Sequence, residues 1–337
     1  MKTQIKRLLY KFACLLFLLS VGACATKPAT QEMPPSVQKT QPAVQKTEQL
    51  KGNISVSGAF ALYPMMQRWV EEYMKINPGV NFDVSAGGAC KGMADALAGA
   101  VDIGMVSRSV SPEEEAKGAF WVAVVKDAVF PTINTQNPEL NDLLAKGVTK
   151  ETFIGIFITG EIKTWGQVVG RPEVTDEIHV YTRSDACGAA DAWAKYLGNK
   201  KQEDLNGIGV FGDPGLLDAV VKDPLGIGFN NLNYAYDAAS GKPVTGTISV
   251  PIDANENGSA DADEIIDTKA KAVEMIANGK YPSPPARDLN LVTKGKPTGL
   301  VADFMVWVLT DGQKLIAEVG YIQLPEAQLS AGLEKLR

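Results

Sequence analysis

Residues 181–198, YTRSDACGAADAWAKYLG, are the stretch that decides the fold. A β-like run ends at Arg-Ser-Asp, a corner of small residues follows, and residues 190–197 have a helical pattern that Gly198 ends. Small residues at a corner let another group approach the backbone closely. The stretch therefore predicts a strand–corner–helix unit of an α/β protein, with the corner as a candidate binding site.

The same unit occurs twice more, closer to the N-terminus. In NISVSGAFALYPMMQRWVEEYMKIN (residues 53–77), an alternating strand turns at Gly58, and Pro64 suits the first turn of a helix. The three- and four-residue spacing of this helix predicts one buried face, formed by Met66, Trp69, Val70, Tyr73 and Ile76. In VNFDVSAGGACKGMADALAG (residues 80–99), a short strand meets a helix through Gly-Gly-Ala-Cys-Lys-Gly. Three such units favour a shared architecture over coincidence.

These corners predict an anion-binding cleft. The first N–H groups of a helix lack partners within it, and the helix dipole adds positive potential at the same end. A helix N-terminus is therefore suited to bind an anion. Arg183, Arg108 and Lys91 lie beside the corners in the sequence. The alternative is an ordinary α/β protein whose corners are tight for packing alone.

Three segments carry a family resemblance. GAFALYP (58–64), SAGGACKGMADALAGAVDIGMVSRS (85–109) and TRSDACGAADAWAKYL (182–197) resemble the signature segments of periplasmic phosphate-binding proteins, and the similarity runs in order from about residue 52 to 337. The resemblance implies a type II periplasmic binding fold with two α/β lobes and a ligand cleft between them. It also implies a receptor that captures phosphate, or a similar tetrahedral oxyanion, and delivers it to an ABC permease in the inner membrane. We expect this receptor to be a monomer.

The resemblance also implies lobe boundaries and ligand contacts. The first lobe is expected at residues 52–126 plus 286–337 and the second at 127–285. The implied contacts, several of them through backbone N–H groups, are Leu62, Tyr63, Ala89, Cys90, Ser107, Arg108, Arg183, Cys187, Gly188 and Ala189, with Lys91 as a further cation.

The second and third corners depart from the family pattern. Relatives carry a Ser-Gly-Thr-like set and Gly-Ser-Gly-Thr, whereas this chain has Ala-Cys-Lys and Ala-Cys-Gly-Ala. At least two hydroxyl donors are missing, which is expected to weaken binding. Some relatives have a carboxylate at the position of Ser107, which accepts the proton of hydrogen phosphate and so rejects sulfate. The serine found here leaves selectivity for phosphate over sulfate open. We expect Lys91 and Arg108 to compensate in part.

The N-terminus predicts export and anchoring. Residues 1–23 have a basic start and a short apolar run, which is typical of a signal peptide and too short for a membrane span. The sequence VGAC resembles a lipobox, so we expect a lipid on Cys24, although an ordinary cleaved signal is the alternative. Residues 24–51 hold few large apolar side chains, which predicts a disordered tether. The body would then be periplasmic and anchored to the outer or the inner bacterial membrane.

Net charge argues against nucleic acid as a partner. The formal charge of the 337 residues is −6, and removing the four basic residues of the leader takes it to −10. So acidic a body lacks the basic surface needed to neutralise many phosphates. A single small anion needs only a local pocket of donors.

Two cysteines, Cys90 and Cys187, remain in the predicted mature body. They are interpreted as small replacements for serine or glycine, as a disulfide across the cleft, or as ligands of a thiophilic metal ion or arsenic oxyanion. His179 is eight residues upstream of Cys187 on an extended strand, too far for a Cys–His dyad, and we predict no enzyme. The rival to a receptor is a non-transporting surface or scaffold protein, or a redox-gated sensor.

Residues 253–264, DANENGSADADE, match the calcium loop D-x-[DN]-x-[DN]-G-x5-E in full. The motif predicts one structural calcium site, with a polar acidic loop as the alternative. Its expected ligands are Asp253, Asn255, Asn257, Ser259 through its carbonyl, Asp261 and Glu264.

Overall fold

The computed structural model describes residues 50–186 and 188–337. The predicted signal peptide, Cys24, Cys187 and the tether up to residue 49 lie outside the described residues. The first strand already includes Lys51, so the predicted tether ends one residue too late. Within the described ranges, no helix combines the length and the apolar character that a membrane crossing requires.

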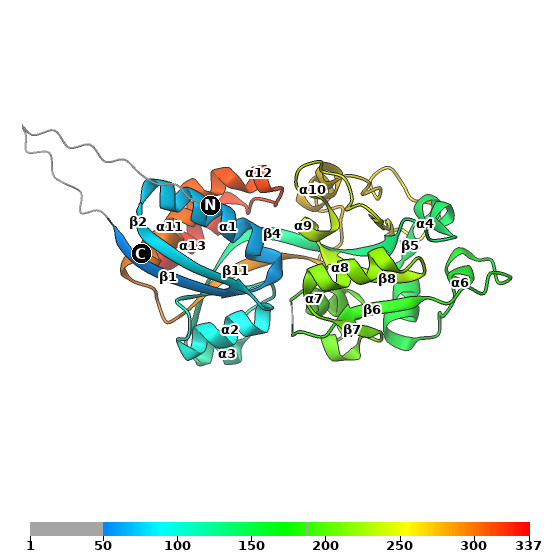
Figure 1. Ribbon diagram of the computed structural model, residues 1–337, viewed down its shortest axis with the longest axis horizontal. Coiled ribbons are helices and arrows are strands. Elements are labelled where there is room, and N and C mark those ends of the chain that lie inside the picture. Colours follow the sequence, from blue (N-terminus) through cyan, green and yellow to red (C-terminus); the bar gives the residue numbers. More distant parts are fainter. Residues whose placement is uncertain (1–49, 187) are drawn as a thin grey trace, which may run out of the picture. The chain divides into compact units, whose positions relative to one another are not determined.

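The described residues form a nine-stranded mixed sheet and a two-stranded one (Figure 1). The large sheet has the order β2-β1-β3-β11-β4-β8-β6-β7, with β9 paired to β4. Its strands are β1 (Lys51–Gly58), β2 (Gly79–Ala86), β3 (Ile103–Val106), β4 (Ala119–Asn134), β6 (His179–Arg183), β7 (Ile208–Val210), β8 (Gly226–Asn231), β9 (Thr247–Ser249) and β11 (Ala286–Lys294). The small sheet pairs β5 (Val148–Thr149) with β10 (Ile252–Asp253).

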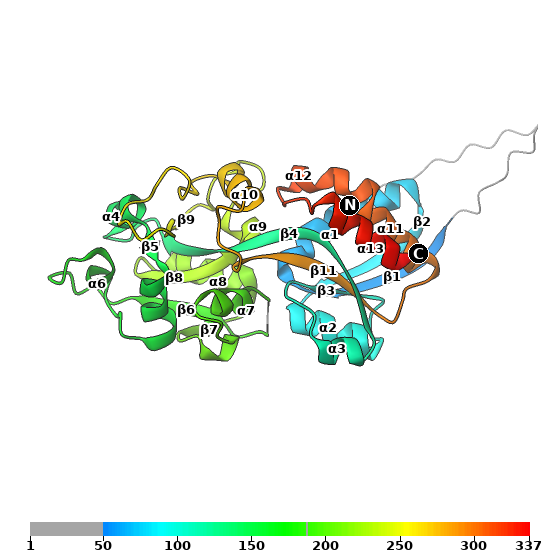
Figure 2. The ribbon, with the colours of Figure 1, turned by 180° about the vertical axis from the view of Figure 1, so that it is seen from behind.

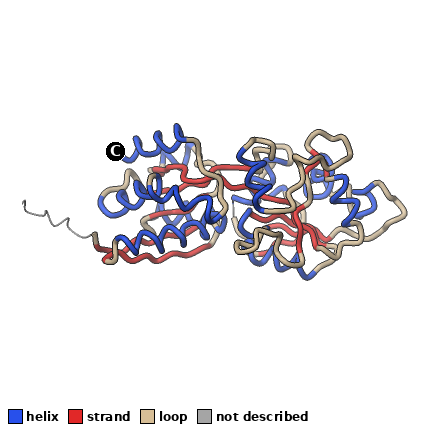
Figure 3. The backbone as a smooth tube through the Cα atoms, turned by 90° about the horizontal axis from the view of Figure 1, so that it is seen from above, coloured by secondary structure: helices blue, strands red, loops and turns tan. Residues whose placement is uncertain are grey.

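Two hydrophobic cores divide this sheet between them. The long strand β4 supplies residues 122–125 to one core and residues 128–130 to the other. Its antiparallel partner β11 likewise supplies Leu289 and Leu291 to the first core and Ala286 to the second. Both strands run from one group of elements to the other (Figures 2 and 3). The prediction of an α/β fold with two lobes is confirmed.

Helices cover the sheet in the first lobe. They are α1 (Tyr63–Ile76), α2 (Ala89–Ala98), α3 (Pro112–Ala116), α11 (Gly299–Leu309), α12 (Ile316–Val319) and α13 (Glu326–Leu336). The predicted face of α1 is buried at Met66, Trp69, Val70 and Tyr73. The prediction for Ile76 is wrong, because this last residue of the helix is 60% exposed.

The helices of the second lobe pack around an aromatic cluster. They are α4 (Leu140–Lys146), α5 (Lys150–Ile154), α6 (Trp165–Val169), α7 (Gly188–Tyr196), α8 (Gly212–Lys222), α9 (Leu232–Ala235) and α10 (Lys269–Ala277). Trp193 of α7 is fully buried, and its ring lies 5.2 Å from Phe153 and 6.0 Å from Phe229 between centroids. Such contacts fix α7 against the sheet.

Candidate functional site between the lobes

The first corner keeps its backbone donors within its own turn. Residues 60–62 form a 3₁₀ turn that runs directly into α1. The Leu62 amide donates to the Ala59 carbonyl at 3.1 Å, and the Tyr63 amide donates to the Phe60 carbonyl. The expectation of unpaired amides is therefore wrong at this corner, because a tight turn satisfies them before the helix begins.

The second corner directs a helix N-terminus at the other lobe. Gly88 has φ = 94°, a left-handed conformation that suits glycine, and α2 starts at the next residue. The Cys90 amide in the first turn of α2 donates to the Ala186 carbonyl at 3.3 Å. An element of the first lobe and the predicted corner of the second therefore meet through a backbone hydrogen bond.

Small residues at the second and third corners permit this contact. A Cβ atom added to Gly188 would lie 2.3 Å from both the carbonyl and the hydroxyl oxygen of Ser107. A Cβ atom added to Gly88 would lie 2.7 Å from the Ala186 carbonyl oxygen. The close approach that the sequence predicted is made here by protein backbone, so the second and third predicted corners lie side by side.

Arg183 lies at the end of β6 and is held by two carboxylates. Its Nε and Nη2 atoms donate to Asp185 at 2.8 and 2.6 Å, and its Nη1 atom donates to Asp213 at 2.7 Å. The Arg183 side chain is 1% exposed and the Asp213 side chain 0%. Asp213 also accepts from the amide and side chain of Asn231. One buried cation thus serves two buried anions, which reduces the positive potential that an anionic ligand would meet.

Sequence reasoning missed Asp213. Its position 30 residues beyond Arg183 carries no local signal. Asp185, by contrast, follows Arg183 by two residues on one strand end and was within the quoted stretch. The neighbouring Phe60 ring lies 5.4 Å from the Arg183 guanidinium carbon, a cation–π contact between the first and third corners.

The two further cations predicted at the corners have partners in the first lobe. Arg108 donates to both carboxylate oxygens of Glu114, at 2.8 and 3.0 Å, and these hydrogen bonds raise the pKa of Arg108 above its ordinary value. The second guanidinium nitrogen is also 3.7 Å from the Cys90 sulfur. Lys91 pairs with Asp95 one helical turn later. Both cations are therefore already paired with acids.

A second buried ion pair links β4 and β11, the two crossover strands that run between the lobes. Arg287 of β11 donates from Nε to the Ser107 carbonyl at 3.3 Å and from Nη1 to Asp127 of β4 at 3.2 Å. It also donates to the side chain of Asn231. Burial, opposed by the charge of Arg287, raises the pKa of Asp127 to about 6. Neither residue was a sequence candidate, because their pairing depends on strands about 160 residues apart.

The sequence of this chain matches a known protein family. Residues 41–312 match the model of the PBP superfamily domain. The chain belongs to the PBP superfamily. The chain is 25% identical over 285 residues to phosphate-binding protein PstS of Bacillus subtilis, and the alignment covers 84% of each chain. It is 26% identical to PstS of Methanocaldococcus jannaschii, covering 83% of this chain and 84% of that one.

Solved structures show the same two-lobed fold as this PBP-superfamily chain. A Clostridium perfringens protein proposed to be a phosphate ABC transporter substrate-binding protein was solved with bound phosphate. It has a TM-score of 0.66 at 23% identity, over 81% of this chain and all of that one. An ABC-type phosphate transport receptor from Vibrio cholerae has a TM-score of 0.58 at 20% identity, over 81% and 100%. The predicted family and fold are confirmed.

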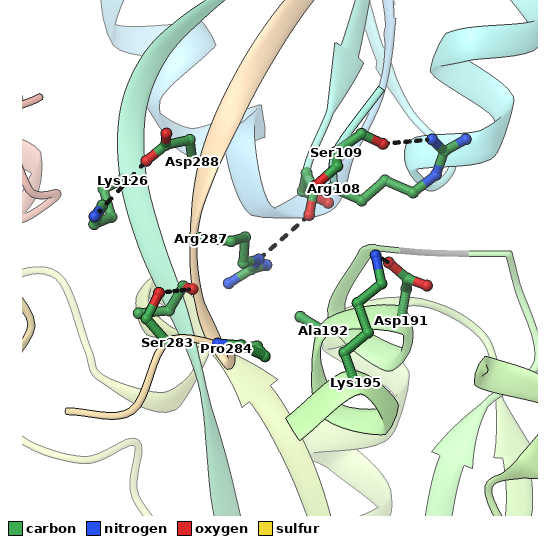
Figure 4. A pocket seen from close by; sticks show the side chains of 12 residues that line it. Arg108, Ser109, Lys126, Asp191, Ala192, Lys195, Ser283, Pro284, Arg287 and Asp288 are labelled. Atoms are coloured by element: carbon green, nitrogen blue, oxygen red, sulfur yellow. Dashed lines mark hydrogen bonds and ion pairs between the residues drawn. The ribbon is translucent and has the colours of Figure 1, made fainter. Parts of the chain in front are cut away.

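A polar cavity lies beside the meeting corners of this PBP-superfamily chain. It has a volume of about 290 Å³, and its wall includes Ser107, Arg108, Lys126, Ala192, Lys195 and Arg287. Figure 4 shows Asp191 and Lys195 extending from α7 on one side and Arg287 extending from β11 on the other. Leu62, Ala89 and Ala189, predicted as ligand contacts, are buried in the hydrophobic cores and are not part of this wall.

The structure describes only one of the two cysteines of the predicted mature body. Cys90 has a free thiol in this structure and is partly exposed. Cys187 lies outside the described residues, so the disulfide and the thiophilic site stay predictions. His179 is exposed on β6, and its Nδ1 atom lies 2.7 Å from an oxygen of Asp223.

The predicted calcium loop is folded around its own hydrogen bonds. Asp253, which is 2% exposed, accepts from the amides of Asn257 and Gly258, at 3.2 and 2.9 Å. Glu264 accepts from the amides of Ala254 and Asp261, at 2.8 and 3.1 Å. No group of three or more His, Cys, Asp or Glu side chains poised for a metal ion was found among the described residues. Calcium binding therefore stays a prediction of the motif.

Proposed function

We propose that this chain is an extracytoplasmic solute-binding lipoprotein that captures phosphate, or a similar tetrahedral oxyanion, between its lobes and delivers it to an ABC importer. Membership of the PBP superfamily supports a binding role. The relatives named PstS support phosphate as the ligand, as does the phosphate-bound structure from Clostridium perfringens. A non-enzymatic receptor agrees with this family.

The contact between Cys90 and Ala186 carries the proposal. An amide in the first turn of a helix has no partner within that helix, so it binds whatever acceptor lies in front of it. Here the acceptor is a carbonyl from the opposite lobe, 3.3 Å away. A phosphate oxygen is a stronger acceptor than a carbonyl, because hydrogen bonds to charged groups are shorter and stronger. An oxyanion that enters the cleft can therefore replace Ala186 as the partner of this donor.

Ser107 and Arg108 supply the next contacts in the proposal. They follow β3 and lie on the first-lobe wall of the polar cavity, close to the corner that contains Gly188. The Arg108 guanidinium is held in place by Glu114 and so needs little reorganisation when an anion arrives. Each hydroxyl that the corners lack costs on the order of 1.5–3 kcal/mol of affinity, which is roughly ten- to a hundredfold. We therefore expect weaker binding than a cleft with a full set of hydroxyls provides.

Calorimetry tests the proposal directly. The protein is unfolded to remove any bound anion, refolded, and titrated with phosphate, sulfate and arsenate, with and without reductant. The proposal expects heat with at least one tetrahedral anion in the reduced protein. An absence of heat with all three would refute it. A response that appears only under oxidising or only under reducing conditions would favour the redox-gated sensor.

The cell location is part of the same proposal. We propose that Cys24 carries a lipid, that the body is periplasmic and monomeric, and that the partner is an inner-membrane ABC permease. A Cys24→Ser variant should move from the membrane fraction to the soluble fraction of the cell envelope and should fail to incorporate labelled palmitate. Membrane retention of this variant would contradict the anchor.

The non-transporting scaffold is the second candidate. It is favoured by one observation, the pairing of Arg183 with two buried carboxylates where a receptor benefits from an available cation. Small-angle scattering of the purified protein with and without phosphate separates the two. A receptor should change its radius of gyration on binding, whereas a scaffold should not.

A further inference from the structure

The most deeply buried of the predicted ligand contacts do not line the polar cavity. Leu62 and Ala89 are fully buried and Ala189 is 1% exposed, each within a hydrophobic core. The amides of Leu62 and Tyr63 already have acceptors in their own turn. The space open to a ligand lies instead along walls that include Ser107 and Arg108 on one side and Cys90 and Ala186 on another, and the wall at Ser107 is the one considered for the ligand's head.

That wall belongs to a cavity larger than a tetrahedral anion. Its volume is about 290 Å³, close to the lower end of the roughly 300–1,000 Å³ typical of small-molecule pockets. At about 30 Å³ for a water-sized group, 290 Å³ holds roughly ten non-hydrogen atoms. Inorganic phosphate would fill about half of it. The remaining half would be left to water or to a further part of the ligand.

Acids already hold two of the cations that line the cavity. The lining contains four cations, Arg108, Lys126, Lys195 and Arg287, against two acids, Asp191 and Asp288. Arg108 and Arg287 also pair with Glu114 and Asp127, which are not in the lining, so the charges of these eight groups balance. Lys126 and Lys195, whose side chains are the more exposed, are therefore the cations most accessible to an anionic ligand.

Two of the cations can exchange partners at little cost. Lys195 pairs with Asp191 at 3.0 Å, and Lys126 pairs with Asp288 at 3.9 Å, all four side chains being 26–41% exposed. Ion pairs this accessible to solvent contribute little to stability. They stand on opposite sides of the cavity, on α7 and on the crossover strands (Figure 4). They can therefore turn to hydroxyl or other polar groups of a ligand.

We propose that the cleft takes an organic phosphate monoester or phosphonate, with its tetrahedral head at Ser107 and Arg108 and its polar body in the space lined by Ala192, Lys195 and Ser283. This inference rests on the proposed function, because it places the head on residues of that anion site. It goes further by assigning the ligand a body. Inorganic phosphate is then a weaker occupant of the same head site.

Paired calorimetric titrations with inorganic phosphate and glycerol 3-phosphate test the inference. The wild-type protein should bind the ester at least about tenfold more tightly, the effect of one additional hydrogen bond to a charged group. Ala192→Met places a longer side chain in the cavity and should lower affinity for the ester about tenfold or more. Its affinity for phosphate should be unchanged, because the proposal assigns Ala192 to the body of the ligand and not to its tetrahedral head.

Two lysine variants give a matched comparison. Lys195→Gln should weaken ester binding by about tenfold, the effect of losing one hydrogen bond to a charged group, with phosphate binding unchanged. Lys222→Gln is the control, because Lys222 also pairs with an aspartate one turn earlier in a helix of the same lobe and is not part of the cavity lining. It should change neither affinity. Melting temperatures of all variants establish that each one folds.

The outcomes separate the inference from the function on which it rests. If phosphate binds as tightly as the ester, or if Ala192→Met lowers both affinities equally, the cavity holds only water and the inference is overturned while the receptor stands. If neither anion produces heat, the receptor assignment falls and the inference falls with it. A preference for the ester that Ala192→Met and Lys195→Gln abolish supports both.

Discussion

Gly188→Ala tests whether contact between corners controls closure of the cleft. The added Cβ atom would lie 2.3 Å from two oxygens of Ser107, where ordinary contacts begin at 3.4 Å, so the corners would have to separate by about 1 Å. One of these oxygens is a backbone carbonyl, which cannot rotate away. Overpacking of this kind costs about 1–3 kcal/mol. The clash exists only when the lobes are together, so the cost shifts the protein towards an open form.

Two measurements report this shift. Apparent affinity for the oxyanion should fall by about 5- to 150-fold, the equivalent of 1–3 kcal/mol. The radius of gyration of the ligand-free protein, measured by small-angle scattering, should increase. Thermal stability should be unchanged or slightly higher, because alanine favours a helix over glycine by up to about 1 kcal/mol and Gly188 begins α7. A loss of affinity without a loss of stability is the distinctive result.

Gly215→Ala is the control for this prediction. Gly215 also lies in a helix of the second lobe, α8, and an added Cβ atom would meet only a methyl group of Val210, at 3.1 Å. Affinity and radius of gyration should both stay at wild-type values. If Gly188→Ala shows an unchanged radius and unchanged affinity, contact between the corners does not control closure and the reasoning is refuted.

Three further changes test the cores, the crossover strands and the predicted calcium loop. Burial raises the pKa of Asp127 in the folded protein from about 3.8 to about 6. The protonated carboxyl therefore stabilises the fold below pH 4, and the free energy of unfolding should fall by about 3 kcal/mol as the pH rises through 6. Asp127→Asn should remove this decline, and equal slopes for variant and wild type in urea unfolding from pH 4 to 7 would contradict it. Calcium at a hundred times its dissociation constant should stabilise the wild type by about 2.7 kcal/mol, and Glu264→Gln should abolish that gain. If calcium does not change the melting temperature of the wild type, the segment is a polar loop that binds no calcium. Trp193→Ala should destabilise the second lobe by about 3–5 kcal/mol because the side chain is fully buried, and a chemical denaturation midpoint near the wild-type value would contradict this.

Short segments of the sequence predicted much of the architecture. The quoted stretch around residues 181–198 indicated a strand, a small-residue corner and a helix, and the structure has β6 and α7 there. Pro64 at the start of α1 and the buried face through Trp69 follow from the same local rules. Ile76 was the exception, because periodicity indicates which face of a helix is apolar but not how far the neighbouring layer extends.

The candidate site was less predictable. Local pattern could place Gly88 and Gly188 at corners, and the structure brings those corners together. It could not indicate that the Leu62 amide is satisfied by its own 3₁₀ turn, since a turn and a helix start look alike in sequence. Nor could it supply Asp213 or the cavity, both of which depend on separate segments meeting in space.

Local sequence alone specified the strands, the helices and the small residues where backbone had to come close. Only the folded chain decided which charges face one another. Arg183 donates a hydrogen bond to Asp213, 30 residues away in the sequence, and Arg287 donates one to Asp127, 160 residues away. Helix and strand preferences arise from neighbours within a few positions, whereas Coulomb attraction and burial act through space between groups that the sheet order brings together.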